Sequence, residues 1–355
     1  MNFGAHHYVP VLKVKRGEKN ALQAIAAPLR SQITPLLEIV ERRSERASTV
    51  GRHLDTAFQG LVDAVRSYRR CFLDTREIAP DGSSAAAAVF DRAAGEGMIF
   101  TPVTGISRIV DVAAALRHNA NGIAVRLTRD EFEEGSLGRN LAAFLARNDL
   151  NHGGVDIIVD LGPVDTLVQD GVANFTTDFL NEVPDHTRWR TLTVSACAFP
   201  ASMGGVNRNS YSLVERNEWK AWRDRLHSNR RRLSRLPTFS DCGIQHPAGV
   251  EGFDPRTMQA SASVRYTLSE DWLLIKGEGT RTNPPSQQFP GLANQLVYGN
   301  LQSYFTGANH CVGCESMRDA AGGAPRLGSL EAWRRLGTIH HITMVMDCMA
   351  SVPWP

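Results

Sequence analysis

The sequence has little net charge, no long apolar run and no dense set of cysteines. Its formal charge is only +2 over 355 residues, so no global field would draw the chain onto nucleic acid, although a local basic patch is compatible with this balance. No window holds 18 consecutive apolar residues, so we expect no transmembrane helix and no membrane partner. The opening segment MNFGAHHYVPVLKVKRGE lacks a long apolar stretch, so we expect no secretory signal there.

The cysteines are scattered, which is unlike the pattern of a small disulfide-linked scaffold. Three of them lie in apolar, strand-like runs, where we expect buried thiols. This distribution favours a reducing environment and therefore a cytoplasmic protein. The six cysteines are Cys71, Cys197, Cys242, Cys311, Cys314 and Cys348.

A rhythm of short apolar runs, each followed by a helix-like stretch, dominates the first two thirds of the chain. Stretches such as LDTAFQGLVDAVRSYRR and LGRNLAAFLARND carry apolar residues three or four apart, as one buried helix face requires. Strands that alternate with helices imply parallel pairing. The expected strands span residues 8–15, 33–40, 71–76, 98–104, 122–127, 155–161, 191–197 and 238–244.

These eight units predict an α/β fold of the (β/α)8 TIM-barrel class, which typically needs about 250 residues. Runs such as VDIIVDL are apolar nearly throughout, as expected for strands that are covered on both sides. The main competitor is an open doubly wound sheet. The presence of eight strand–helix units disfavours this open sheet, and so does the lack of a G-x-G-x-x-G motif after the first strand.

The rhythm changes near residue 260. The segment ASVRYTLSEDWLLIKGEG predicts two strands joined by a Ser-Glu-Asp turn, and ANQLVYGNLQSYF predicts a helix. The segment SLEAWRRLGTIHHITMVM would supply the eighth helix of the barrel. We therefore expect a single barrel domain over residues 1–355, in which residues 245–325 form an elaborated loop that contains a β-hairpin.

Three segments together resemble the beta protein family of T4-like phages and bacterial genomes. They are YVPVLKVKRGEKNAL at the start, VRYTLSEDWLLIKGEG in the hairpin and WRRLGTIHHITMV near the end. The loop CVGCESM departs from the family, in which a Trp-containing loop is expected at this place. The resemblance implies a setting of phage–host conflict, such as antiviral defence, or of mobile elements. It implies no particular reaction.

Charged residues mark the C-terminal ends of most expected strands, where barrels place their sites. Ionised groups in apolar strands are costly unless they are paired, hydrated or bound to a metal. These residues therefore predict either a polar ligand site or a set of internal ion pairs that close the barrel mouth. The carboxylates are Glu38, Asp74, Asp160 and Asp241, and the cations are Lys13, Lys15, Arg76 and Arg126. The expected hairpin adds Arg265 and Lys276.

Two further motifs could contribute to such a site. Gly204 and Gly205 permit positive φ angles, and their N–H groups could form an anion nest, although an ordinary Gly-rich turn explains them as well. His340 and His341 point about 100° apart on a helix. One of them could therefore face the cavity as an acid, base or ligand, or both could be packing residues.

A possible zinc site and a basic stretch complete the candidates. His310-Cys311-x-x-Cys314 suggests zinc, but zinc sites usually contain a second ligand pair at a similar spacing. Cys348 and His340 are available as further ligands but lie in a different pattern, so the sequence favours a site without zinc. Trp219 and Trp222 lie in an Arg-rich stretch that could bind nucleic acid, but their spacing is more typical of the buried stripe of an outer helix.

Two classes of function remain. The first is a hydrolase of a phosphate ester, nucleotide or nucleic acid, with the four carboxylates and the histidine pair as catalytic candidates and a divalent metal ion as a candidate cofactor. The lysines, arginines and glycines named above would then bind the anionic substrate. The second is a non-catalytic barrel that recognises a phage, host or other partner protein encoded nearby.

Overall fold

The computed structural model describes residues 3–4, 6–42, 49–133, 135–248, 260–323 and 327–353. The chain divides into two compact units, each of which is described separately below. The first comprises residues 1–15, 30–197 and 217–242, and the second comprises residues 16–29, 198–216 and 243–355. None of the helices in the described ranges combines the length and apolarity needed to cross a bilayer.

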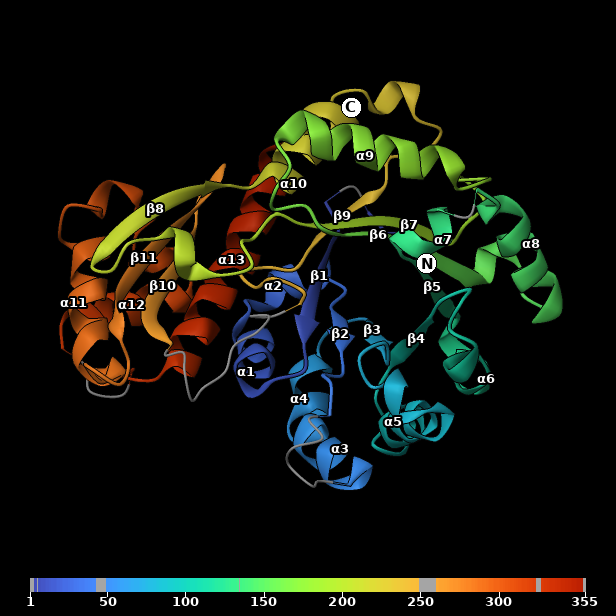
Figure 1. Cartoon of the computed structure of the whole chain (residues 1–355), viewed down its shortest axis with the longest axis horizontal. Helices are drawn as coiled ribbons and strands as arrows, with labels where there is room; N and C mark the ends of the chain where they lie inside the picture. The colour runs from blue at the N-terminus through green and yellow to red at the C-terminus, as the bar shows by residue number, and fades with distance from the viewer. Residues whose placement is uncertain are drawn as a thin grey trace. The chain divides into compact units, whose positions relative to one another are not determined.

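The first unit is a closed barrel of eight parallel strands in the order β1-β2-β3-β4-β5-β6-β7-β9, and β1 pairs with β9 to close the ring (Figure 1). The predicted (β/α)8 TIM-type fold is confirmed, and each of the eight expected runs contains or overlaps one barrel strand. The strands are β1 (Tyr8–Lys13), β2 (Leu36–Glu38), β3 (Cys71–Asp74), β4 (Phe100–Thr104), β5 (Ile123–Leu127), β6 (Val155–Pro163), β7 (Thr191–Cys197) and β9 (Thr238–Asp241).

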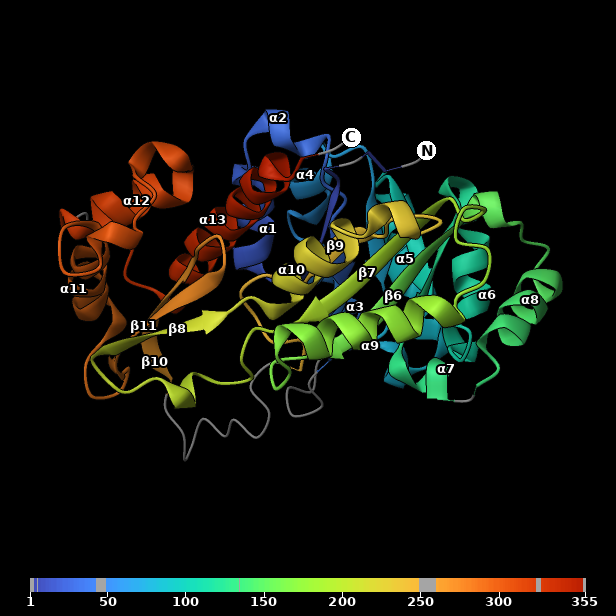
Figure 2. The same cartoon turned by 90° about the horizontal axis from the view of Figure 1, so that it is seen from above.

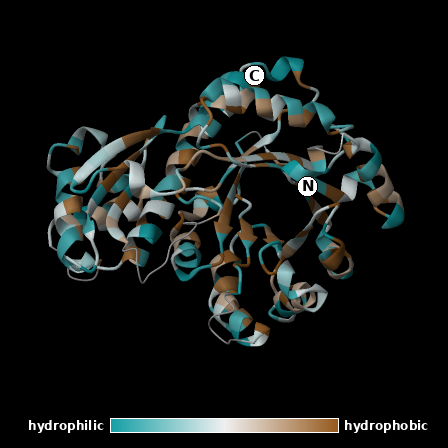
Figure 3. Cartoon of the chain, in the orientation of Figure 1, coloured by the Kyte–Doolittle hydropathy of each residue, from teal (hydrophilic) through white to brown (hydrophobic). Residues whose placement is uncertain are grey.

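Amphipathic helices cover the outside of the barrel because each carries one apolar stripe that must be buried. In Figure 3 the short strands β1–β4 are mostly brown, whereas the surrounding helices show both colours. The helices of this unit are α3 (Val50–Phe58), α4 (Leu61–Val65), α5 (Ser83–Gly95), α6 (Ile109–Arg117), α7 (Arg129–Glu133), α8 (Leu137–Arg147), α9 (Gln169–Glu182) and α10 (Asn217–Ala221).

The Arg-rich stretch after β7 forms α10 and a following π-helical turn at Trp222–His227. Trp219 and Trp222 are 1% and 2% exposed, and their rings stack 5.7 Å apart. The interpretation of these tryptophans as a buried stripe is confirmed, and neither ring is exposed for stacking on a base.

The interior of the barrel is built in layers. A central apolar layer contains Val9, Val11, Leu36, Phe72, Val103, Ala124 and Ile158, all 5% exposed or less. Since residues two apart on a strand face the same side, the next residues along each strand form the layers above and below this core. The layer toward the N-terminal ends of the strands contains the Asp156 carboxylate, which binds Arg70 at 3.0 Å.

Phe3 covers the N-terminal end of this interior. Its ring stacks on His7 with centroids 3.9 Å apart, and the Arg70 guanidinium lies 4.9 Å from its centroid. His7 is buried, and its Nε2 lies 2.9 Å from the Thr34 hydroxyl. The N-terminal segment is therefore fixed to the barrel by stacking and by a buried hydrogen bond.

Acid is expected to weaken this end of the barrel through His7. Burial, with help from the positive charges of Arg70 and Arg69, lowers the pKa of His7 from 6.5 to about 3. Below about pH 6.5 the unfolded chain therefore binds a proton that the folded chain does not, and stability falls as the pH drops toward the folded pKa. Urea unfolding should show a loss of about 2 kcal/mol between pH 7 and pH 5 from this residue alone.

The matched variant for this test is His7→Gln, which can still bond to Thr34 and does not titrate. Its stability should change less with pH than that of the unsubstituted chain over the same interval. Equal slopes for the two proteins would show that His7 takes up its proton in the folded state as readily as in the unfolded state.

The second unit combines a three-stranded antiparallel sheet, in the order β10-β11-β8, with helices. The expected hairpin is confirmed as β10 and β11. The sequence did not predict β8, which pairs with β11 from Asp271↔Glu215 to Lys276↔Ser210. The strands are β8 (Ser210–Glu215), β10 (Ser261–Thr267) and β11 (Asp271–Gly279).

The helices of this unit are α1 (Arg16–Ala24), α2 (Ala27–Arg30, with its last residue in the barrel unit), α11 (Pro285–Val297), α12 (Val312–Ala321) and α13 (Leu330–Ser351). The long helix α13 packs against β10, α1 and α12. Their shared apolar core includes Tyr266, Phe289, Met317 and Trp333. The assignment of α13 as the eighth barrel helix, and of residues 245–325 as a loop of a single domain, stays a prediction.

Candidate functional site

The barrel strands bring a row of charged residues together next to the apolar interior, on the side of the strands' C-terminal ends. Each of five interior residues is followed two positions later by a charged residue on the same face of its strand. The register pairs Lys13 with Glu38 and Glu38 with Asp74 on neighbouring strands. The charged layer consists of Lys13, Glu38, Asp74, Arg126 and Asp160, and we call it the rim cluster.

Arg126 is the centre of the rim cluster. Its Nη1 donates to Glu38 Oε1 and to Asp74 Oδ2, both at 2.7 Å, and its Nε donates to Asp160 Oδ2 at 2.9 Å. The Arg126 side chain is only 2% exposed. A guanidinium presents five N–H donors in a fixed plane, so it can hold three carboxylates in one arrangement.

Arg108, which lies in the loop after β4, provides a further cation for the cluster. Its Nη1 and Nη2 donate to the two oxygens of Asp74 at 2.6 and 3.3 Å. Nη1 also lies 3.3 Å from Asp111 Oδ2, and Asp111 accepts from the hydroxyls of Thr75 and Thr104. The sequence reasoning missed Arg108. Its position just beyond the C-terminal end of a barrel strand is the signal that could have identified it.

The environment shifts the pKa values of two neighbouring carboxylates in opposite directions. Burial raises the pKa of Glu38, and the attraction of Arg126 only partly opposes this. For Asp74 burial acts in the same upward direction, but Arg108 and Arg126 outweigh it and hold the pKa below its usual value. Pairs of groups with divergent pKa values are typical of acid–base sites, although structural ion pairs show them too.

The more exposed cations lie around this buried centre. Lys13 binds Glu77, and Arg76 Nη1 lies 3.3 Å from Asp160 Oδ2 while its side chain is 47% exposed. Lys15 is exposed. The structure thus brings six of the predicted barrel residues to one end of the strands, and Lys15 lies two residues beyond the end of β1.

Asp241 does not join the rim cluster, because side chains along β9 alternate between the two faces of the barrel wall. It accepts a hydrogen bond from the Tyr8 hydroxyl at 2.5 Å. The neighbouring Cys242 packs against the interior apolar layer. Since adjacent residues on a strand face opposite sides, Asp241 points away from the barrel interior.

With this geometry in place, one comparison identifies the family. The model of the family described as Beta protein matches residues 8–347. The chain belongs to the Beta protein family. No curated protein is significantly similar to it.

The remaining predicted binding residues of this Beta protein family member belong to the second unit, where both cations among them have hydrogen-bond partners. Lys276 Nζ donates to the carbonyls of Met203 and Val206 at 2.7 and 2.8 Å. Arg265 donates to the Ile244 carbonyl at 2.6 Å, and burial lowers the pKa of Arg265 to about 10. Both cations therefore support loops of their own unit.

The Gly-rich turn does not adopt the backbone expected of an anion nest. Neither Gly204 nor Gly205 has a positive φ angle. The Gly204 N–H donates to the Ser202 hydroxyl at 3.1 Å, and the turn forms a short 3-10 helix at Met203–Gly205. This geometry matches the interpretation as an ordinary turn.

His340 and His341 are both fully buried on α13 and have different partners. His341 Nδ1 lies 3.0 Å from the Thr267 hydroxyl. His340 Nδ1 lies 3.2 Å from Cys314 Sγ. Over the described residues, the one group of three or more convergent metal-ligand side chains consists of His310, Cys311, Cys314 and His340, so the rim carboxylates do not form such a group.

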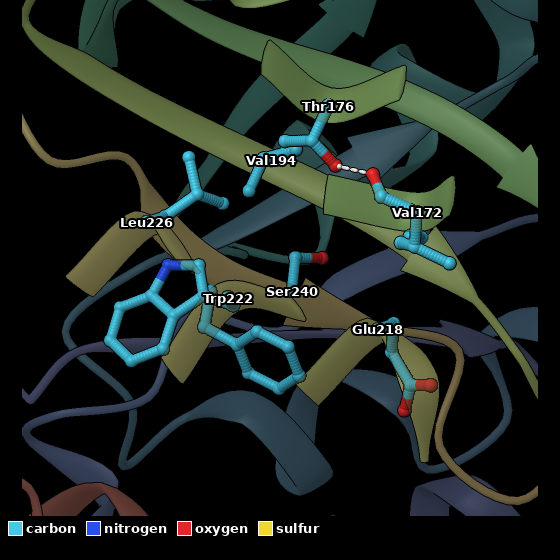
Figure 4. Close-up of a pocket in the computed structure, with 9 residues that line it drawn as sticks. Val172, Thr176, Val194, Glu218, Trp222, Leu226 and Ser240 are labelled. Atoms are coloured by element: carbon cyan, nitrogen blue, oxygen red, sulfur yellow. Dashed lines mark hydrogen bonds between the residues drawn. The ribbon is translucent and has the colours of Figure 1, made fainter. Parts of the chain in front are cut away.

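Figure 2 shows helices α9 and α10 beside the barrel strands β7 and β9. A small cavity lies between these helices and the outer side of the two strands, away from the rim cluster (Figure 4). Its walls are mostly apolar, with Trp222 and Leu226 on one side and Val194 on another. Thr176 already donates its hydroxyl to the Val172 carbonyl. The cavity is about the size of a single water molecule, so it cannot hold a substrate.

Proposed function

We propose that the barrel is a hydrolase of a phosphate ester, such as a nucleotide or a nucleic acid, with its active site at the rim cluster. The observation that carries this proposal is the row formed by Lys13, Glu38 and Asp74 on three adjacent strands. It places a cation beside two carboxylates with opposed pKa shifts at the C-terminal ends of the strands. In barrel enzymes this end carries the catalytic groups.

Each rim residue would have its own role in the proposed hydrolysis. Glu38, whose pKa burial raises above that of an exposed glutamate, is suited to exchange a proton with the attacking water or the leaving oxygen. Arg126 is a positioning residue that fixes Glu38 and Asp74. The more exposed Arg76 and Lys13 would neutralise the phosphate oxygens.

A divalent metal could assist this reaction, because hard cations prefer carboxylate oxygens and would bind between Asp160 and Asp74. In the present arrangement both carboxylates bind arginine. Metal binding would therefore require the guanidinium groups to yield some of these oxygens. A rise in melting temperature with Mg²⁺ or Mn²⁺ that Asp160→Ala abolishes would support this role.

Glu38→Gln is the decisive variant for the catalytic proposal. Loss of a general acid–base group should lower kcat by roughly 10²- to 10⁴-fold on p-nitrophenyl phosphate, bis(p-nitrophenyl) phosphate or a nucleotide panel. The matched control is Glu41→Gln, which removes an exposed carboxylate three residues further on and should leave kcat unchanged. Equal activity of both variants with the unsubstituted protein would refute the role of Glu38.

The second candidate is a non-catalytic barrel that recognises a protein partner, in a phage–host or mobile-element setting. It is favoured by the arginine partners that Glu38, Asp74 and Asp160 already have, as in a structural ion-pair network. In this case conservative rim variants should retain biological activity in a survival assay. Charge reversal of the outer Arg230–Arg232 segment, which forms a 3-10 turn, should remove it.

A further inference from the structure

Four metal-ligand side chains converge in the second unit, outside the rim cluster. His310 ends the 3-10 turn at Ala308–His310, Cys311 is the N-cap of α12, Cys314 lies in the first turn of α12, and His340 lies in the middle of α13. One ligand atom from each residue lies within 4.8 Å of the others. The sequence separates His340 from the other three by 26 residues or more, which explains why spacing alone did not reveal the set.

The distances match the edges of a small tetrahedron. Cys314 Sγ lies 3.6 Å from Cys311 Sγ, 3.8 Å from His310 Nδ1 and 3.2 Å from His340 Nδ1. With Zn–S near 2.3 Å and Zn–N near 2.0 Å, ligand atoms around a tetrahedral zinc are roughly 3.3–3.8 Å apart. The three distances from Cys314 Sγ are therefore already close to those that the ion requires, and the other ligand atoms lie within 4.8 Å of one another.

Both histidines turn their second nitrogen to an oxygen acceptor. His310 Nε2 lies 2.8 Å from Asp347 Oδ2, and His340 Nε2 lies 2.7 Å from the Thr267 carbonyl. A carbonyl can only accept, so His340 Nε2 must carry its proton. Metal-binding histidines typically have such an outer partner, which fixes the ring and directs the other nitrogen to the metal.

Hydrogen bonding within the cluster cannot satisfy all four groups when they are neutral. With both Nε2 atoms protonated, both Nδ1 atoms are acceptors that face the single proton of the Cys314 thiol. Cys314 and His340 are fully buried, so water does not reach their ligand atoms. A cation that replaces the thiol protons would bind all four lone pairs at once.

We propose that His310, Cys311, Cys314 and His340 bind a zinc ion in a closed Cys2His2 site. All four positions of the tetrahedron are filled by protein, so the ion is structural. It joins the start of α12 to α13, whose backbones already lie close together, since a Cβ on Gly313 would approach the Leu336 carbonyl to 2.7 Å. Tyr266 stacks on the His340 ring with centroids 3.8 Å apart and holds it in place.

The first test uses the full chain and the metals themselves. Protein purified without chelator should contain about one zinc per chain, and the apo-protein should bind Co²⁺ with the visible bands and the thiolate charge-transfer band of a tetrahedral sulfur-containing site. Cys311→Ser and Cys314→Ser should lose both. Cys348→Ala, which removes a buried cysteine of α13 outside the cluster, should retain both.

A milder pair of variants covers the case in which the cysteine variants do not fold. Asp347 is largely exposed and contacts the cluster through His310. Asp347→Ala should weaken zinc affinity about 10- to 100-fold. Asp319→Ala, which removes an exposed carboxylate of α12 that pairs with Arg318, should not change the affinity.

Other outcomes would overturn the proposal. A cluster held as a Cys314 thiolate with an imidazolium would give no zinc and no cobalt spectrum. A Cys311–Cys314 disulfide would leave two fewer titratable thiols in the unfolded protein. Because the site belongs to the second unit and uses none of the rim residues, either result would leave the proposed hydrolase untouched.

Discussion

Arg126→Met is expected to destabilise the barrel by about 3–5 kcal/mol at neutral pH, as judged by urea unfolding. The substitution leaves Glu38, Asp74 and Asp160 close together in a site where each is 5% exposed or less. Removing one partner of a buried ion pair costs more than the pair contributes, because the remaining charges stay buried without compensation. Asp74 keeps Arg108 and Asp160 keeps Arg76, so Glu38 should carry most of the penalty.

The sign of the pH dependence provides an internal check. Without Arg126 the folded-state pKa values of these carboxylates rise, so the folded chain binds protons more readily than the unfolded chain. The deficit relative to the unsubstituted protein should therefore shrink as the pH falls from 8 to 5. The control is Arg225→Met, which breaks the exposed pair with Asp170 and should cost less than about 1 kcal/mol.

A deficit for Arg126→Met that is as small as that of the surface control would contradict the buried network. It would mean that water hydrates the carboxylates in place of the guanidinium. In that case Glu38 would also lose the environment that raises its pKa, and the acid–base role proposed for it would fail.

The barrel could be predicted because its strands are covered on both sides. β6 and β7 are therefore apolar runs that contrast with the helical periodicity around them. β8 was missed for the opposite reason. It is an edge strand in which the apolar side chains of Tyr211 and Leu213 are exposed. The alternation of apolar and polar residues along it therefore does not correspond to a buried face. The Gly-rich turn at Met203–Gly205 shortly before it also favoured a loop.

The charged residues of the rim cluster could be predicted from the sequence at the C-terminal ends of the strands. The loop residues that pair with them could not. The offset of two from Leu36 to Glu38 and from Phe72 to Asp74 is visible in the sequence. Arg108 and Glu77 come from loops whose paths depend on tertiary packing. The same limit applies to the metal cluster, since only the packing of α12 against α13 brings His340 to Cys314.

Asp156 forms a second buried ion-pair group at the opposite ends of the strands. It is fully buried, and it binds Arg70 at 3.0 Å and Arg190 at 2.5 Å and accepts the Thr191 hydroxyl at 2.7 Å. It lies near the start of β6, whereas Asp160 lies four residues further along. In barrels the N-terminal end of the strands contributes to stability and the C-terminal end to chemistry.

Asp156→Ala is therefore expected to cost as much stability as Arg126→Met, about 3–5 kcal/mol, but with a different pH response. It leaves Arg70 and Arg190 without their carboxylate, and arginine does not lose its charge at any accessible pH. The deficit should therefore stay constant from pH 5 to pH 8, measured by urea unfolding as before. Added sulfate should stabilise this variant more than the unsubstituted protein, because the two guanidinium groups then form an anion site.

The two variants together separate a structural layer from a functional one. Per folded molecule, Asp156→Ala should keep the hydrolase activity proposed for the rim cluster, because the apolar layer of Phe72, Ala124 and Ile158 lies between the two groups. Arg126→Met should lose activity as well as stability, because it releases Glu38. Equal loss of activity in both would mean that the ends of the barrel are coupled through its core, and the rim cluster could then not be treated as an independent site.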